Sequence, residues 1–355
     1  MLPRFALGEF GICPPYSQTF GPDDPSIEIV DFLNEVNARP GGGTVILEAG
    51  VYMEMSLVVS GTVCIRSAGD GDATASGLEP SVHLFRSAYP VREGGVLTLR
   101  GVWVDGQGDD WNRVSVGATL FAEHVRFYAS KRDDYVDAVL VNEGNAYLRD
   151  TWIGGGELLG GIDNTGTLVM IGGGIQDISL GGFNALENRG FAHLDRVSIR
   201  DNCGDSLYGT KGIVNHAGGA LNVTSSAIAG NGDDCTVMPL HTAHADVVGV
   251  WNQAGAHAHI VSSTIADNVS LDEEGETHSA TGIRNDGHLE LERSIVTDSC
   301  DAVIDLGYNV GTCPVMHPTS IEADPLLMPD SIEIAAGSPA IDLIPLELCS
   351  ETDAL

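Results

Sequence analysis

Acidic and histidine side chains gather in three segments of the chain, residues 203–211, 232–248 and 269–281. Carboxylate oxygens are the ligands that Ca²⁺ prefers. The candidate binding residues of these segments are Asp205, Asp233, Asp234, His241, His244, Asp246, Asp272, Glu273 and Glu274. Asp233, Asp234 and Asp246 are the candidate calcium ligands, whereas His241, His244 and Asp246 could hold Zn²⁺ instead. The sequence has no EF-hand loop and no nonapeptide calcium repeat.

Catalysis on polysaccharides would need further groups. A glycoside hydrolase uses two carboxyl groups as acid and base, and the chain has acidic doublets at 109–110, 133–134 and 233–234. A polysaccharide lyase would use an Arg or Lys base together with Ca²⁺. Arg149, Arg196 and Arg293 are expected at similar places in their repeats, but Lys131 and Lys211 are the only lysines. Acidic doublets in turns are usually solvated, so no catalytic residue is assigned.

The composition restricts the class of partner. The formal net charge of the 355 residues is −33, which repels nucleic acid and anionic membrane surfaces. No apolar run is long enough for a membrane span. Glycine, at 45 residues, is frequent and aromatic residues are sparse, which favours an all-β fold with many tight turns.

Seven cysteines leave at least one without an intramolecular partner. Cys203 and Cys235 follow equivalent positions of two repeats, so they are a candidate disulfide. Cys300 and Cys313 bracket a short segment and are a second candidate pair. Buried free thiols are the alternative for both pairs. The N-terminus lacks an apolar region of signal-peptide length. Because the cysteine usage and the scarcity of lysine look extracellular, we expect a secreted or cell-surface protein whose chain begins at the mature N-terminus.

A repeated unit organises most of the chain. An apolar residue, an Asn and a Gly are followed by alternating apolar residues and often by Ser-x-Ile-x-x-Asn. The repeated asparagines are Asn142, Asn164, Asn188, Asn215, Asn252 and Asn285. Their separations of 22, 24, 27, 37 and 33 residues predict a parallel β-helix with three short strands per coil. The leucine-rich-repeat skeleton is absent, and the units are too short for propeller blades.

These asparagines are expected at one corner of each coil, where Asn accepts the left-handed conformation and its amides can stack into a ladder. The acidic segments follow the Ser-x-Ile-x-x-Asn end of successive coils, so they are expected side by side along one edge of the solenoid. A ligand-binding role for the asparagine row is the alternative.

The ends of the solenoid have their own patterns. Ile29, Phe32, Leu33 and Val36 predict an amphipathic helix over Ser26–Ala38 that covers the first coil. We expect an irregular segment at 1–25 and one β-helix domain at 26–345. Within it, 26–80 forms the cap and first coils, 82–303 the coils, and 304–345 the closing region, before a tail at 346–355.

The repeats resemble right-handed parallel β-helix proteins of the pectin-lyase-like superfamily, and most of all the polymorphic-outer-membrane-protein-like repeats of bacterial surface proteins. Gly307-Tyr-Asn309, Asp324-Pro-Leu326 and the segment GSPAID at 337–342 resemble the choice-of-anchor Q region of such proteins. The resemblance implies a surface-associated chain, although the Asp-Asn-Gly-Gly stretch of that region is missing here. Gly50-Val-Tyr-Met-Glu54 resembles the start of pectin esterases, but their catalytic segments are absent.

Together, the sequence favours an extracellular, non-catalytic β-helix that presents its acidic loop edge to a glycan, a cell-surface protein or a divalent cation such as Ca²⁺. A carbohydrate-active enzyme, either a polysaccharide lyase or a glycoside hydrolase, is the alternative. A segment of a phage or virus tail fibre is a second alternative.

Overall fold

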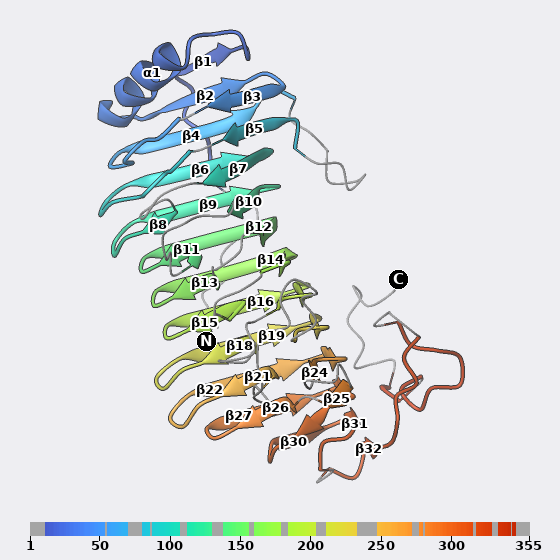
Figure 1. Cartoon of the computed structure of the whole chain (residues 1–355). Helices are drawn as coiled ribbons and strands as arrows, with labels where there is room; N and C mark the ends of the chain where they lie inside the picture. Colours follow the sequence, from blue (N-terminus) through green and yellow to red (C-terminus); the bar gives the residue numbers. More distant parts are fainter. Residues whose placement is uncertain are drawn as a thin grey trace.

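The structure is a computed structural model that describes residues 11–53, 55–69, 80–85, 87–106, 112–129, 138–155, 160–178, 184–203, 211–232, 247–271, 277–279, 281–314, 317–328, 333–341 and 343–345. Short strands stack into an elongated column, with the N-terminal coils at one end and the C-terminal coils at the other (Figure 1). No described helix is both long and apolar enough to cross a membrane.

Each complete coil has three strands. In one coil, β16 (Phe191–Asp195) is the first leg, β17 (Ser198–Arg200) the second leg and β18 (Lys211–Asn215) the third strand, after which β19 (Ala220–Thr224) begins the next coil. The two legs of all coils form one 22-stranded sheet, which we call the long sheet, and the third strands form an eight-stranded short sheet. Every register pairing within these two sheets is parallel, for example Leu194 with Val223. The predicted parallel β-helix is therefore confirmed.

The strands divide as follows. The other first legs are β2 (Gly43–Leu47), β4 (Thr62–Ser67), β6 (Val96–Arg100), β9 (Thr119–Glu123), β22 (His257–Val261), β27 (His288–Glu292) and β30 (Ile304–Gly307). The other second legs are β3 (Gly50–Met53), β5 (Val82–Phe85), β7 (Val102–Gly106), β10 (Arg126–Ala129), β20 (Ala227–Ala229), β23 (Thr264–Ala266), β28 (Ile295–Val296), β31 (Val310–Gly311) and β32 (Ile321–Glu322). β12 (Asn145–Gly154) and β14 (Thr167–Gln176) run through both legs. The other third strands are β8 (Arg113–Val114), β11 (Ala138–Asn142), β13 (Gly160–Asn164), β15 (Leu186–Asn188), β21 (Val248–Asn252), β26 (Thr281–Asn285) and β29 (Ser299–Cys300).

Alternation along each strand fills the interior. On the first legs, every second side chain points inward, so that Leu148, Met170, Leu194, Val223 and Ile260 stack coil upon coil and are fully buried. A period of two is what the parallel strand geometry requires of a face that packs against the core. Equivalent residues on the opposite face of the same strands point to solvent.

The corner between the two legs holds one residue with a positive φ in each of several coils. Register equivalents at this corner are His124, Asp150, Gly172, Arg196, Ser225, Ser262, Arg293 and Tyr308, with φ between 46° and 70°. The repeated asparagines do not adopt this conformation, so the expectation that they supply left-handed corners is wrong: in the turns that follow Asn215 and Asn252, the residues with a positive φ are Gly218 and Gly255. Arg196 and Arg293 share this corner, whereas Arg149 lies one position earlier and pairs with Ile171.

The six repeated asparagines end or follow the third strands and point into the coil. Five hydrogen bonds of 2.7 to 2.9 Å run along the series Asn142, Asn164, Asn188, Asn215, Asn252 and Asn285, each Nδ2 donating to the next Oδ1. Each Nδ2 also donates to a backbone carbonyl of the following coil at 2.7 to 3.2 Å. These bonds use both hydrogens of each Nδ2 from Asn142 to Asn252, and along the row only the buried Oδ1 of Asn142, the first member, has no hydrogen-bond partner among the described residues. The row starts at Asn142 because its register partner in β8 is Val114.

A second asparagine ladder lies at the end of the second legs. Asn202 donates to Asn231 at 2.8 Å, Asn231 to Asn268 at 3.1 Å, and Asn268 to the carboxylate of Asp298 at 2.8 Å. The first three are buried. Asn231 and Asn268 close the Ser-x-Ile-x-x-Asn motif, and Asn202 closes the related segment that begins at Val197. The last residue of the motif therefore has the same physical role as the asparagines of the first ladder.

The serine of that motif forms a third row. The backbone amides of Val197, Ser226 and Ser263 each donate to the hydroxyl of the serine one coil further on, at 3.0 to 3.2 Å. At the end of the row, the amide of Ser294 donates to Oδ1 of Asn309 at 2.8 Å. Three parallel rows of side-chain hydrogen bonds thus fix the register of the coils at three of their corners.

The N-terminal end is covered by α1 (Ser26–Ala38), as predicted, with Ile29, Phe32, Leu33 and Val36 buried against the first coil (Figure 1). The expectation that residues 1–25 are irregular is wrong at β1 (Ser17–Phe20), which pairs in parallel with β2. Backbone hydrogen bonds at an open sheet edge do not require a particular sequence, so this strand left no periodic signal. A disulfide between Cys13 and Cys64 ties the same segment to β4.

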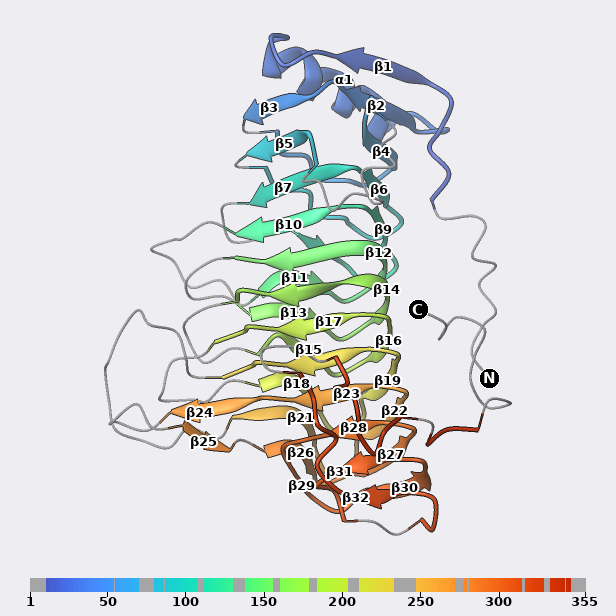
Figure 2. The same ribbon diagram turned by 90° about the vertical axis from the view of Figure 1, so that its right-hand side faces the viewer.

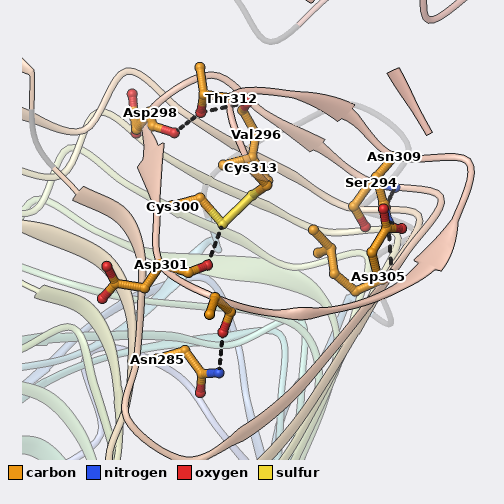
Figure 3. Close-up of a disulfide and its surroundings, with 12 residues drawn as sticks. Asn285, Ser294, Val296, Asp298, Cys300, Asp301, Asp305, Asn309, Thr312 and Cys313 are labelled. Carbon is orange, nitrogen blue, oxygen red and sulfur yellow. Dashed lines mark hydrogen bonds between the residues drawn. A yellow bond between two sulfur atoms is a disulfide. The ribbon is translucent and has the colours of Figure 1, made fainter. Parts of the chain in front are cut away.

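The C-terminal end is closed by a second disulfide, between Cys300 and Cys313, which are 13 residues apart (Figure 3). Beside it, Asn309 donates through Nδ2 to the Leu291 carbonyl at 2.9 Å and to Asp305 at 2.8 Å. Thr312 donates its hydroxyl hydrogen bond to the Asp298 carbonyl. Cys203 is also disulfide-bonded. Its partner lies outside the described residues, so the pairing with Cys235 stays a prediction.

Candidate functional site

The acidic segments leave the column along one edge. The second legs β17, β20 and β23 are stacked neighbours, and so are the third strands β18, β21 and β26 that follow them. All three connections therefore depart and return at equivalent places, and the hairpin of β24 (Val269–Leu271) and β25 (Thr277–Ser279) projects from this edge (Figure 2).

All the candidate binding residues of the acidic segments lie outside the described residues. They are Asp205, Asp233, Asp234, His241, His244, Asp246, Asp272, Glu273 and Glu274. The candidate calcium ligands are among them. Within the part of the chain that the structure describes, no three His, Cys, Asp or Glu side chains surround a common point as metal ligands would.

A polar cluster lies on the outer face of the short sheet, around the asparagines that end the third strands. Asp163 in β13 and Glu187 in β15 are register partners on adjacent strands. Arg189 and His216 each follow the ladder asparagine of their coil, and Gln253 does so one coil later. We call Asp163, Glu187, Arg189, His216 and Gln253 the sheet-face cluster.

The members of this cluster are joined by direct contacts across four coils. Arg189 places Nη1 2.6 Å from Asp163 Oδ1 and Nη2 2.5 Å from Glu187 Oε2. His216 Nε2 lies 3.2 Å from the same Glu187 oxygen, and its Nδ1 lies 3.2 Å from Gln253 Oε1. Adjacent strands are about 4.8 Å apart, so the cluster offers one polar group per coil along the column axis.

The two carboxyl groups have opposite pKa shifts. The hydrogen bond from His216 lowers the pKa of Glu187 to about 2, helped by Arg189 and by the amide of Asn184, which together outweigh burial. Burial raises the pKa of Asp163 above its usual value, against the opposing effect of Arg189. A carboxyl pair whose pKa values are pushed apart on one surface marks a candidate functional site.

The sheet face continues toward the C-terminus with an aromatic and cationic group. Trp251 is the register partner of Val214 and Arg284. Its indole Nε1 donates to Asp286 at 2.8 Å. The Lys211 ammonium lies 5.7 Å from the ring centroid and the Arg284 guanidinium 4.8 Å from it. Trp251 therefore lies beside two cationic side chains, of which Lys211 is buried, in a strongly acidic molecule.

The sequence interpretation missed this face, although a signal for it exists. The residues directly before and after each repeated Asn form the triplets Asp163-Asn-Thr165, Glu187-Asn-Arg189, Val214-Asn-His216, Trp251-Asn-Gln253 and Arg284-Asn-Asp286. Since the Asn points inward, both of its neighbours must point outward. Their alignment across coils follows from the register that the asparagines already indicate.

Comparison with known proteins gives a limited result. No protein-family model and no curated protein matches the chain. Among solved structures, the chain is similar to the crystal structure of pectate lyase Pel9A at 14% sequence identity and a TM-score of 0.42, over 93% of this chain and 91% of that chain.

Proposed function

We propose that the protein is a β-helix that binds an extended glycan across its coils on the outer face of the short sheet, without catalysing a reaction on it. One observation carries this proposal: the sheet-face cluster offers hydrogen-bonding groups at successive strands along the axis. The strand spacing of about 4.8 Å is of the order of one pyranose ring. Paired carboxylate, guanidinium and amide groups can each bond two neighbouring hydroxyls of a sugar.

Binding is favoured over catalysis by the state of Glu187. A pKa of about 2 makes this carboxylate a very weak base near neutral pH. Its oxygens already accept hydrogen bonds from Asn184, Arg189 and His216. A group held in this way can orient a ligand but has little capacity to abstract a proton.

The test is calorimetric binding to a panel of neutral and uronate-containing oligosaccharides. Replacing Arg189 by Ala should weaken binding at least about tenfold, because hydrogen bonds to a charged group contribute about 1.5–3 kcal/mol. Arg39→Ala is the matched control, since Arg39 packs over the Tyr16 ring at the opposite end of the solenoid. The proposal fails if the wild-type protein binds no glycan, or if both variants bind as the wild type does.

The second candidate function is a carbohydrate-active enzyme in which Asp163 acts as the acid. The raised pKa of Asp163 beside Arg189 favours it. Incubation with the same polysaccharides, followed by chromatography of the products, tests turnover. Product formation that is lost in Asp163→Asn would establish the enzyme and overturn the non-catalytic proposal.

The acidic loop edge is proposed to bind Ca²⁺ through Asp233, Asp234 and Asp246. The support is the oxygen-rich composition of three connections that leave one edge together. A rise in melting temperature on adding Ca²⁺, reversed by a chelator, is the expected result. The matched variant replaces Asp233, Asp234 and Asp246 by Asn. If Ca²⁺ raises the melting temperature of this variant as much as that of the wild type, the site is contradicted.

We further propose an extracellular, surface-associated location of the choice-of-anchor Q kind. The disulfides Cys13–Cys64 and Cys300–Cys313 support an oxidising compartment. The resemblance of 307–309, 324–326 and 337–342 to that region supports attachment at the surface. Detection of the native protein by antibody on intact cells tests the location, and its recovery only from lysed cells would refute it.

A further inference from the structure

A group of histidines lies on a different surface, the outer face of the long sheet. His257 and His259 alternate along β22, and His288 and Glu290 alternate along β27. The register pairs His257 with His288 and His259 with Glu290. Because side chains two apart on a strand share a face, all four residues lie on one side of two adjacent strands. We call them the histidine array.

The contacts within the histidine array are short. The rings of His257 and His288 have centroids 5.4 Å apart. His288 Nε2 lies 3.3 Å from a Glu290 carboxylate oxygen. The Nε2 atom of His259 is buried and has no hydrogen-bond partner among the described residues. A buried ring nitrogen without a partner, on the same face as three other ligating side chains, is a position that a bound ion would satisfy.

We propose that the histidine array binds one divalent transition-metal ion of the Zn²⁺, Cu²⁺ or Ni²⁺ class. Imidazole is a preferred ligand of these ions, and a carboxylate completes the set. His257, His259 and His288 supply ring nitrogens, and Glu290 supplies the oxygen. A hard ion such as Ca²⁺ would prefer an all-oxygen site.

Ion binding by the histidine array requires its side chains to rotate. In the described conformations the rings do not yet surround one point. His257 and His288 are exposed, and exposed side chains change rotamer within nanoseconds. The backbone needs no movement, because the four residues already form two neighbouring register pairs on adjacent strands. The strongly negative charge of the molecule raises the local concentration of cations.

On either side of the histidine array, the register partner on the next strand is not a histidine or an acidic residue. Asn222 of β19 is the register partner of His259 on one side, and Ile304 of β30 is the partner of Glu290 on the other. His193 lies in the same column beyond Asn222, separated from His259 by one strand. His193 is therefore a matched histidine that stands outside the proposed site.

The experiment titrates the full-length protein with Zn²⁺ by calorimetry and with Cu²⁺ by electron paramagnetic resonance. Hyperfine splitting from at least two imidazole nitrogens is expected in the wild type. The double variant His257→Ala, His288→Ala should lose Zn²⁺ affinity by more than about tenfold, with His259→Gln giving an independent single-site loss. His193→Ala should bind as the wild type does.

The array variants separate this site from His241 and His244 of the acidic loop edge, which these variants leave unchanged. Affinity should fall as the pH is lowered, because protonated imidazole cannot be a ligand. Unchanged binding in both array variants would overturn the proposal, as would the absence of nitrogen coupling in the wild type. Neither result depends on glycan binding, since the array and the sheet-face cluster lie on different sheets.

Discussion

Asp298 ends the second asparagine ladder and is its only charged member among the described residues. Its carboxylate accepts two hydrogen bonds from Asn268, one from Nδ2 at 2.8 Å and one from the backbone amide at 3.1 Å. Burial nevertheless raises the pKa of Asp298 to about 6, and the nearby charge of Asp267 acts in the same direction. The folded pKa of Asp298 exceeds the unfolded one, so protonated Asp298 stabilises the folded state. This contribution is fully present below about pH 4 and is lost as the pH rises through about 6.

Asp298→Asn should therefore stabilise the protein at pH 7. The amide oxygen keeps the bonds from Asn268 without placing a charge in a buried position. We expect a gain of roughly 1–2 kcal/mol at pH 7 and almost none at pH 4. Chemical denaturation at the two pH values measures it. Equal effects at both would show that the charge of Asp298 is not responsible.

At the level of strands and turns, the ladders transmit register from coil to coil. Asn215 accepts from Asn188 and donates to Asn252, at 2.8 Å each, in a fully buried site. Asn215→Ala removes the hydrogen bond donated by Asn188 and the bonds accepted by Asn252 Oδ1 and the His257 carbonyl, and a buried polar group left unpaired costs about 1–3 kcal/mol. We expect the free energy of unfolding to fall by about 2–4 kcal/mol in urea denaturation. Asn222→Ala, on the outer face of β19, is the control, and a similar loss there would contradict a special role of the ladder.

The disulfide between Cys300 and Cys313 also acts at the level of strands and turns. Replacing Cys300 and Cys313 by Ser should destabilise mainly the last coil, by about 3 kcal/mol for a loop of this length. Since coils contact mainly their neighbours, the loss should stay local. Hydrogen exchange should accelerate in β29 to β31 and remain unchanged in β12 to β16. Uniform acceleration throughout the column would refute this locality.

The helix and many of the strands and register positions could be predicted from the sequence, for identifiable reasons. The amphipathic helix Ser26–Ala38 was predicted because four apolar residues recur at helical spacing. The position of each repeated Asn indicated the register, because a buried amide must find a partner. β1 was missed because its pairing uses the backbone, and the sheet-face cluster was missed because outward residues carry no hydrophobic pattern. The acidic segments attracted the functional interpretation through composition alone.

At the scale of the whole molecule, charge dominates. A net charge of −33 on a narrow column repels itself, and this repulsion is weaker in the unfolded chain, where the charges are further apart. Raising NaCl from about 0.05 M to about 0.5 M shortens the Debye length from about 14 Å to about 4 Å. We expect a higher melting temperature at the higher salt at pH 7, and a much smaller difference near pH 4, where many carboxylates are protonated. A salt effect of equal size at both pH values would argue against charge repulsion.

The connections from second legs to third strands enter and leave the coil between two hydrogen-bonded asparagine rows. Asn202, Asn231 and Asn268 stand before these connections, and Asn215, Asn252 and Asn285 stand beyond them. The sequence of these connections can therefore be changed without changing the geometry of the coil. Lengthening a flexible connection also costs little free energy. Foreign peptides grafted into adjacent connections would be displayed in a row at a spacing of about 4.8 Å on a rigid backbone. Such a row would engage a repetitive target multivalently, so the molecule is suited to engineering as a scaffold for ordered peptide arrays.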